Sequence, residues 1–319
     1  MLTFPKEYFD EEIRDDFKVD TTMKTVWAAE LEVLSEIAKV CQKHQIPWYM
    51  AYGSLLGTVR HEGFIPWDDD MDIWMMREDY MRFLSVAQEE LPTGYILKSP
   101  LLEEGYPEFH SCVLNSDSIS IEPEHLQRFH GCPFVVGIDI FPMDVLPDTP
   151  DLLQSKLFQA VRQCALMVKE GRRDDEVELL LQLLEKQCDV TINRDYLQYP
   201  DSEQDQQELI SGLCGLANEI AMWHEGEKSL EICMYLDYFK YKKKYERIWF
   251  GDTQWMPYEG FEVPVPTDYD AILHVIYGDY TVKIRNSAAH DYPFYKKQLE
   301  ELRKRVQGGR NVRISTRLF

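Results

Sequence analysis

Residues 66–73 of the chain, Pro-Trp-Asp-Asp-Asp-Met-Asp-Ile, limit most strongly what it can fold into. Side chains on a strand alternate between its two faces. A strand over this stretch would place Asp68, Asp70 and Asp72 on one face and Met71 and Ile73 on the other. Three carboxylates on one face repel one another unless a cation lies among them, and an all-oxygen ligand set favours a hard ion. The stretch therefore predicts a site for Mg²⁺, or for a similar ion such as Mn²⁺.

A second motif lies just upstream. An apolar run over residues 46–52 leads into Gly53 and Ser54, and we expect a short helix from there to Arg60. Free backbone N–H groups at such a helix N-terminus form a natural seat for phosphate. Arg60 and His61 lie between this seat and the carboxylates, and arginine is suited to bidentate phosphate contacts. The alternatives are a helix N-cap for Ser54, a helix-end salt bridge for Arg60 and a structural role for His61.

A third carboxylate interrupts an apolar run at residues 135–141, Val-Val-Gly-Ile-Asp-Ile-Phe. A carboxylate in an apolar strand is costly unless it is paired or ligated. Asp139 is therefore a candidate metal ligand or general base, on a strand beside the one that carries Asp70 and Asp72. The alternative is an aspartate that faces solvent from an edge strand.

Composition narrows the class of protein. The 319 residues carry a formal net charge of −22, which argues against nucleic acid as a partner. The seven cysteines are scattered and form no CxxC pair, which favours reduced thiols in an intracellular protein. The first residues are acidic and do not resemble a signal peptide, and no apolar window approaches the roughly 18 residues that a spanning helix needs. We therefore expect a cytoplasmic protein without a transmembrane segment.

Hydrophobic spacing predicts an α+β protein, with an amphipathic helix over 21–42 and a helix-rich middle. The predicted parts are an acidic N-terminal arm (1–20), a catalytic core (21–149), a helical insertion or cap (150–245), a return to the core (246–295), and a basic C-terminal helix or tail (296–319).

Other sites can be excluded. A calcium loop starting at Asp68 would need glycine where Ile73 stands, and glutamate where Asp79 stands. The sequence Gly-Ser-Leu-Leu-Gly-Thr-Val-Arg lacks the lysine of a P-loop. The histidines show no zinc-binding spacing.

The order Gly-Ser, spacer, Asp-x-Asp, then a third Asp on a later strand resembles the nucleotidyltransferase superfamily. A closer resemblance is to the LicD family, phosphocholine transferases of bacterial surface glycans that are related to fukutin and fukutin-related protein. It is carried by YGSLLGTVRHEGFIPWDDDMDIWMMREDY at 52–80, by VGIDIFPMDVLPD at 136–148, and by VPVPTDYDAIL and YGDY at 263–280.

The resemblance implies a nucleotidyltransferase-like mixed sheet flanked by helices, and a site with assigned roles. Gly53 and Ser54, with Arg60 and His61, would hold a nucleotide diphosphate. Asp68, Asp70 and Asp72 would bind Mg²⁺, and Asp139 would complete the metal site or deprotonate the acceptor hydroxyl. The implied reaction moves a phosphoryl-alcohol from a CDP-linked donor onto a glycan or lipid-linked glycan and releases CMP. Phosphocholine from CDP-choline is the first choice for the transferred group.

Three alternatives stay open. The transferred group could be phosphoethanolamine, glycerol phosphate or ribitol phosphate. The chain could instead be a true nucleotidyltransferase that releases pyrophosphate, or a catalytically silent nucleotide-binding protein. A lipid-linked acceptor would imply peripheral contact with the inner membrane face, for which the basic end from Lys296 is the candidate segment.

Overall fold

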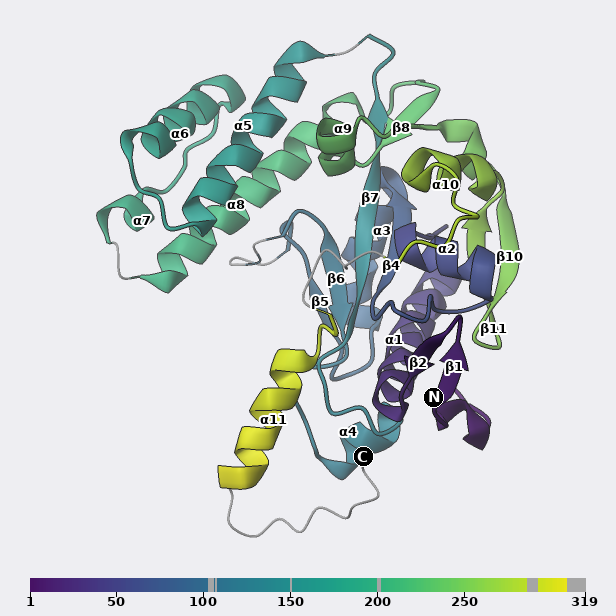
Figure 1. The fold of residues 1–319 in the computed structure, drawn as a ribbon. Coiled ribbons are helices and arrows are strands. Elements are labelled where there is room, and N and C mark those ends of the chain that lie inside the picture. The colour runs from purple at the N-terminus through teal and green to yellow at the C-terminus, as the bar shows by residue number, and fades with distance from the viewer. Residues whose placement is uncertain (103–105, 107, 150, 200–201, 286–291, 309–319) are drawn as a thin grey trace.

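The computed structural model describes residues 1–102, 106, 108–149, 151–199, 202–285 and 292–308, and Figure 1 shows their arrangement. The last part of the expected basic C-terminal segment, residues 309–319, lies outside the described residues. The predicted fold class is confirmed, because a mixed sheet is flanked by helices and a further group of helices extends from one end of it (Figure 1).

The central sheet runs in the order β3-β4-β7-β6-β5. β4 and β7 are parallel neighbours, whereas the other pairings in this order are antiparallel. β7 is the longest strand, and its end at residues 144–146 pairs with β8, which pairs in turn with β9. The strands are β3 (Tyr49–Met50), β4 (Met71–Met76), β5 (Ile96–Lys98), β6 (Ser111–Leu114), β7 (Gly137–Leu146), β8 (Glu231–Cys233) and β9 (Tyr245–Glu246).

Two helices, α1 (Thr21–His44) and α3 (Arg77–Glu90), pack on each other and on β7 (Figure 1). α1 begins after Asp20, whose carboxylate accepts a hydrogen bond from the backbone N–H of Met23 at 2.8 Å and so caps the helix. It ends at Gln45, which adopts a left-handed conformation. The helix predicted over 21–42 is thus confirmed.

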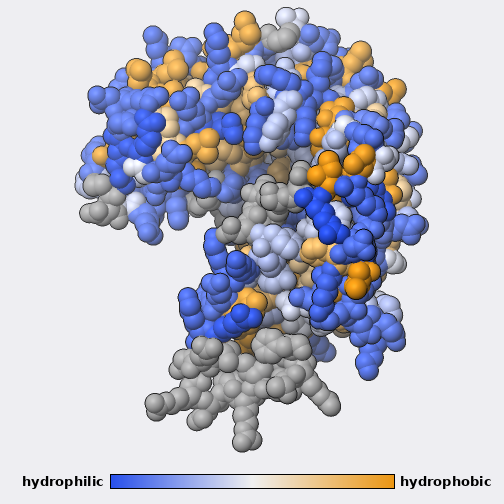
Figure 2. Space-filling view, viewed as in Figure 1, coloured by the Kyte–Doolittle hydropathy of each residue, from blue (hydrophilic) through white to orange (hydrophobic). Residues whose placement is uncertain are grey.

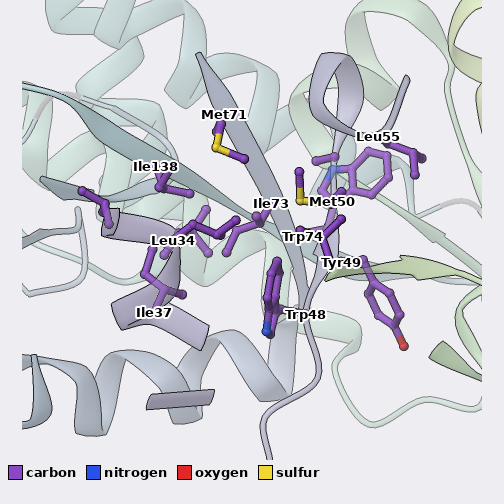
Figure 3. Packing of buried hydrophobic residues seen from close by; sticks show 14 of the residues in the cluster. Leu34, Ile37, Trp48, Tyr49, Met50, Leu55, Met71, Ile73, Trp74 and Ile138 are labelled. Atoms are coloured by element: carbon purple, nitrogen blue, oxygen red, sulfur yellow. The ribbon is translucent and has the colours of Figure 1, made fainter. Parts of the chain in front are cut away.

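The main hydrophobic core lies between these helices and the sheet. Figure 3 shows Met71 and Ile73 of β4 and Ile138 of β7 within this core, together with side chains of α1. Because side chains alternate along a strand, Asp72 and Asp139 must face away from the core. The packing of three apolar residues therefore decides where two carboxylates point.

The remaining elements surround the sheet at its other face and its edges. α2 packs on β4, and it also contacts α10 and β10. The elements are β1 (Glu12–Arg14), β2 (Phe17–Val19), α2 (Tyr52–His61), α4 (Pro123–Arg128), α9 (Tyr235–Tyr241), β10 (Thr253–Tyr258), β11 (Phe261–Pro266), α10 (Tyr269–Tyr277) and α11 (Lys296–Gly308). Short 3₁₀ turns lie at Lys6–Phe9, Met222–His224 and Arg247–Phe250.

A helical part with its own hydrophobic core is formed by α5 (Leu152–Lys169), α6 (Asp175–Cys188), α7 (Asp195–Gln198) and α8 (Glu203–Ala221). Figure 2 shows that the surface is hollowed between this part and α11. None of the helices in the described ranges is long and apolar enough to cross a bilayer.

A buried ion pair ties the helical part to the sheet. Arg77 at the start of α3 donates to both carboxylate oxygens of Asp144 on β7, at 2.6 and 2.9 Å. The same guanidinium donates to the side-chain oxygen of Asn218 on α8 at 3.0 Å. Both charged side chains are 2% exposed. A fully buried pair of this kind fixes the positions of α3, β7 and α8 relative to one another, because leaving either charge unpaired is costly.

The acidic stretch differs from its prediction in one respect. The strand β4 begins at Met71, so Asp68 and Asp70 lie in the loop before it. The physical reason lies in the parallel neighbour β7, since Met71 pairs with Ile138 and β7 itself begins only one residue earlier, at Gly137. The backbone carbonyl of Asp68 instead accepts from the indole N–H of Trp27 at 3.1 Å.

Candidate functional site

Two carboxylates from neighbouring strands form the centre of the site. Asp72 on β4 and Asp139 on β7 are Cα partners in the parallel register. Both side chains point to the sheet face opposite the core. The prediction that Asp139 lies on a strand beside the one that carries Asp72 is confirmed. The backbone N–H of Asp72 donates to the hydroxyl of Ser54 at 2.9 Å, which links β4 to α2 at this point.

The loop before β4 brings further carboxylates to the same place. Oxygens of Asp68, Asp69 and Asp70 lie within 4.8 Å of one another. Asp69, which sequence reasoning did not assign to the site, is fully buried and accepts from the backbone N–H of Phe294 at 2.6 Å. That bond assigns Asp69 a structural role as well, because it holds the segment before α11 against the loop.

The electrostatics of the group fit a divalent cation. Burial and then the neighbouring carboxylates, first Asp70, raise the pKa of Asp68 and of Asp72 well above the usual range. Asp139 also contributes to the shift of Asp72. Oxygen donors on a loop and two adjacent strands are the ligand type that Mg²⁺ prefers, and a cation would relieve their repulsion.

A further acid faces this group from α1. Glu30 is 1% exposed, and one of its carboxylate oxygens has no hydrogen-bond partner among the described residues. Burial, followed by the charges of Asp70 and the other three aspartates of the acidic stretch, raises its pKa well above the usual range. The buried position of Glu30 could have been predicted from the sequence. It lies on the apolar side of α1, three residues after Trp27 and four before Leu34.

The N-terminus of α2 lies directly against the carboxylates. A Cβ atom on Gly53 would lie 2.5 Å from a carboxylate oxygen of Asp68, so only glycine leaves room for this approach. Ser54 is 3% exposed, and its hydroxyl accepts from Asp72. The structure thus brings Gly53 and Ser54 to the site, where Ser54 positions Asp72.

Arg60 and His61 lie at the other end of α2. Arg60 donates to the backbone carbonyl of Tyr280 at 3.1 Å. A ring nitrogen of His61 lies 2.8 Å from the carboxylate of Asp15, which also pairs with Lys283. Arg60 thus faces the segment after α10, and His61 faces the turn between β1 and β2. Their role in phosphate binding stays a prediction.

Tyr277, the last residue of α10, lies near groups at both ends of α2. Desolvation and then the charges of Asp68, Asp72 and Asp70 raise its pKa and Arg60 lowers it, although the residue is 42% exposed. Tyr277 therefore lies close to the carboxylate group and to Arg60 at the same time.

A histidine that sequence reasoning did not assign lies beside Asp139. The Nε2 atom of His110 is 3.3 Å from an Asp139 oxygen, and its ring centroid is 4.6 Å from that of Phe141, with the rings tilted by 34°. Burial lowers the pKa of His110, but the hydrogen bond and charge of Asp139 outweigh burial and raise it. The pair can hold or pass on a proton. This contact was hard to predict from the sequence, because only the antiparallel pairing of β6 with β7 brings His110 to Asp139.

The mixed sheet thus gathers carboxylates beside the N-terminus of the short helix α2. Residues 45–109 match the family described as LicD/FKTN/FKRP, nucleotidyltransferase domain. Over this segment the chain is similar to the LicD family, in agreement with the resemblance carried by the motif at 52–80. The matched range contains Gly53, Ser54 and the carboxylates of the loop and β4, whereas Asp139 and the helical part lie outside it.

Curated relatives match over segments of similar length. The lipopolysaccharide cholinephosphotransferase LicD of Haemophilus influenzae is 38% identical over 69 residues, which is 22% of this chain and 26% of that protein. An uncharacterized protein of Rickettsia typhi is 36% identical over 67 residues, 21% of this chain and 22% of that protein. The chain thus spans about a quarter of the length of the curated relatives it matches.

Proposed function

We propose that the protein is a Mg²⁺-dependent transferase that moves a phosphoryl-alcohol from a CDP-linked donor onto a hydroxyl of a glycan or lipid-linked glycan. Phosphocholine from CDP-choline is the first choice, because the relative from H. influenzae is a cholinephosphotransferase. The observation that carries the proposal is the side-by-side placement of Asp72 and Asp139, next to Asp68 and Asp70.

Each group has a task that follows from its position. Asp68, Asp70 and Asp72, with Asp139, would hold Mg²⁺, or Mn²⁺ in its place. When bound, such an ion neutralises phosphate charge and orients the donor. The backbone N–H groups at the start of α2 face the same place and would bind donor phosphate oxygens. Ser54 keeps Asp72 in position through its hydrogen bond.

The transfer itself is a displacement at the phosphorus that carries the alcohol. The acceptor hydroxyl oxygen forms the new bond to phosphorus, and the bond to the bridging oxygen breaks, so that CMP leaves. Asp139 would take the hydroxyl proton, and His110 at 3.3 Å would orient the carboxylate and share the proton. Asp139 therefore acts as metal ligand or as base, and variants at His110 can separate the two roles.

We further propose that the protein works in the cytoplasm. All seven cysteines are free, and six of them are buried, which suits a reducing compartment. Peripheral contact with the inner membrane face through the segment from Lys296 is proposed for the case of a lipid-linked acceptor.

The test uses the full-length protein with Mg²⁺ and a panel of CDP-choline, CDP-ethanolamine, CDP-glycerol, CDP-ribitol, CTP and UTP. Thermal stabilisation reports binding, and released CMP or pyrophosphate reports the reaction. We expect metal-dependent stabilisation by a CDP-alcohol and slow CMP release. Pyrophosphate release from a triphosphate would replace the proposal with a true nucleotidyltransferase. No response to any member, with or without metal, would support a silent protein.

A further inference from the structure

Positive charge gathers at one end of the sheet, in a chain that is acidic as a whole. Five of the 34 lysines and arginines lie within residues 238–248, Tyr-Phe-Lys-Tyr-Lys-Lys-Lys-Tyr-Glu-Arg-Ile, beside a single acid. This run covers the end of α9, the strand β9 and the start of the 3₁₀ turn that follows it. Against a formal net charge of −22, a local excess of this kind is a candidate surface for an anionic partner.

Three lysines of the run lack a counter-charge. Within the described part of the chain, no carboxylate forms an ion pair with Lys240, Lys242 or Lys243. The ammonium groups of Lys240 and Lys243 lie 4.7 and 4.9 Å from the ring centroid of Tyr241. Two like charges beside one ring repel each other, and an anionic surface would offset this repulsion. Lys242 has a φ of 58° at the left-handed position that ends α9, where glycine is the usual residue.

Two of the most exposed aliphatic side chains of the described ranges lie beside this run. Leu230 is 79% exposed and Ile248 is 75% exposed. The backbone N–H of Arg247 donates to the carbonyl of Leu230 at 2.7 Å, which brings the residue before β8 to the turn after β9. The ion pair of Lys244 with Glu231, at 2.5 Å, connects the lysine run to the same place. Ammonium groups and aliphatic side chains therefore form one basic-apolar surface, which consists of Leu230, Lys240, Tyr241, Lys242, Lys243 and Ile248.

The basic segment α11 differs from this surface in its apolar side chains. It lies at the other end of the molecule from α9 and β8 (Figure 1). Leu299 and Leu302 of α11 pack against the main core, and none of the described residues of this helix is a large exposed apolar side chain. Of the two basic segments, only the one at α9 and β9 therefore combines lysines with exposed aliphatic side chains.

The basic-apolar surface lies near the proposed site. Burial first raises the pKa of Asp72, and the charge of Asp237 in the first turn of α9 adds to this shift. The start of α9 is thus close to the carboxylates. α9 has seven residues, and at about 1.5 Å per residue it is about 10 Å long. The lysines at its end are therefore about one short helix away from the site.

We infer that the basic-apolar surface docks on a bilayer that contains anionic phospholipids. The negative surface potential of such a bilayer attracts lysines within about 8 Å, the Debye length at physiological ionic strength, so that charges farther away in this acidic protein are largely screened. Leu230 and Ile248 would leave water for the acyl boundary, which a soluble polyanion does not offer. A docked molecule would have its site close to a lipid-linked acceptor.

The test is sedimentation of the full-length protein with phosphatidylcholine vesicles, with and without phosphatidylglycerol, at physiological ionic strength. We expect binding only where phosphatidylglycerol is present. The triple variant Lys240→Gln, Lys242→Gln, Lys243→Gln should bind about 100-fold more weakly, because each lysine near an anionic surface contributes about 1 kcal/mol, or about fivefold.

The matched comparison is the same charge change in α11, Lys296→Gln, Lys297→Gln, Lys304→Gln, which should leave vesicle binding as it is. Absence of wild-type binding to phosphatidylglycerol vesicles overturns the inference. So does a loss of binding in the α11 variant with none in the variant at α9. The assay needs neither donor nor turnover, so that failure of the transferase proposal would not affect its outcome.

A second variant distinguishes a bilayer from a soluble polyanion. Ile248→Ser removes an exposed aliphatic side chain and no charge, and it serves as well if the lysine variant does not fold. It should weaken vesicle binding about tenfold, since burying an aliphatic side chain contributes about 1.5 kcal/mol or more. Binding to dextran sulfate, a soluble polyanion, should not change. Equal affinity of the wild-type protein for dextran sulfate and for vesicles, or no effect of Ile248→Ser on vesicle binding, overturns the inference.

Discussion

Asp72 and Asp139 are register partners on the parallel strands β4 and β7, although 66 residues lie between them in the sequence. The apolar residues beside them, Ile73 and Ile140, are buried in the core and fix the opposite orientation of both carboxylates. The sheet therefore sets the backbone positions of both residues. This relationship gives the proposed site its centre and sets the first prediction.

Asp139→Asn should abolish CMP release while the protein stays folded. The substitution preserves shape but removes the proton acceptor and one proposed ligand, and the loss of a general base costs about 10²–10⁴-fold in rate. The measurement is initial rate with CDP-choline and Mg²⁺, alongside circular dichroism. Asp117→Asn, an exposed aspartate, is the control and should keep full activity. Full activity of Asp139→Asn would remove this residue from the site.

Gly53→Ala should weaken metal binding. The new Cβ atom would meet the Asp68 carboxylate at 2.5 Å, so this side chain must move away from its neighbours. We expect a higher Mg²⁺ concentration for half-maximal stabilisation in thermal denaturation. Gly212→Ala on α8 is the matched control, because nothing lies within 4 Å of its Cβ. There the change should stabilise the helix by about 0.5–1 kcal/mol. Unchanged Mg²⁺ dependence in Gly53→Ala would contradict the assigned place of Asp68.

Stability should depend on pH in opposite ways with and without metal. The pKa of Asp68 and of Asp72 is raised in the folded protein, by burial first and then by Asp70, so the folded state binds more protons than the unfolded state. Without metal, the free energy of unfolding should therefore fall as pH rises from about 4, the unfolded pKa, through the raised folded values. Mg²⁺ needs ionised carboxylates, so its stabilising effect should grow over the same range.

Melting temperatures in EDTA and in Mg²⁺ at matched ionic strength would measure this difference. Asp72→Asn should flatten the metal-free pH dependence, and Asp117→Asn should leave it as it is. Parallel curves with and without Mg²⁺ would show that the carboxylates bind no such ion.

Arg77→Met should destabilise the protein by about 3–5 kcal/mol, because it leaves the Asp144 carboxylate buried and unpaired. Arg82→Met on the same helix removes an ion pair with Asp79 whose arginine is 47% exposed, and should cost less than about 1 kcal/mol. Denaturant unfolding of both variants measures the difference. Similar losses in the two variants would contradict a special role of the buried pair in holding α8 to the sheet.

Local patterns were sufficient for much of the fold. The helices over 21–44 and 152–169 follow from apolar residues at helical spacing, and the packing against the sheet agrees with this local preference. Asp139 could be singled out because a carboxylate inside an apolar strand needs a partner. The start of β4 could not be predicted, because it depends on where its parallel partner β7 begins.

The sequence by itself determined which chemical groups the site contains, since the acidic stretch, Gly53, Ser54 and Asp139 all lie in recognisable local patterns. Tertiary structure alone decided which other groups join them. Glu30 arrives from α1 and His110 from the residue just before β6, and both depend on packing between segments distant in sequence. Periodicity reports which face of an element is buried, but it carries no information about which faces meet.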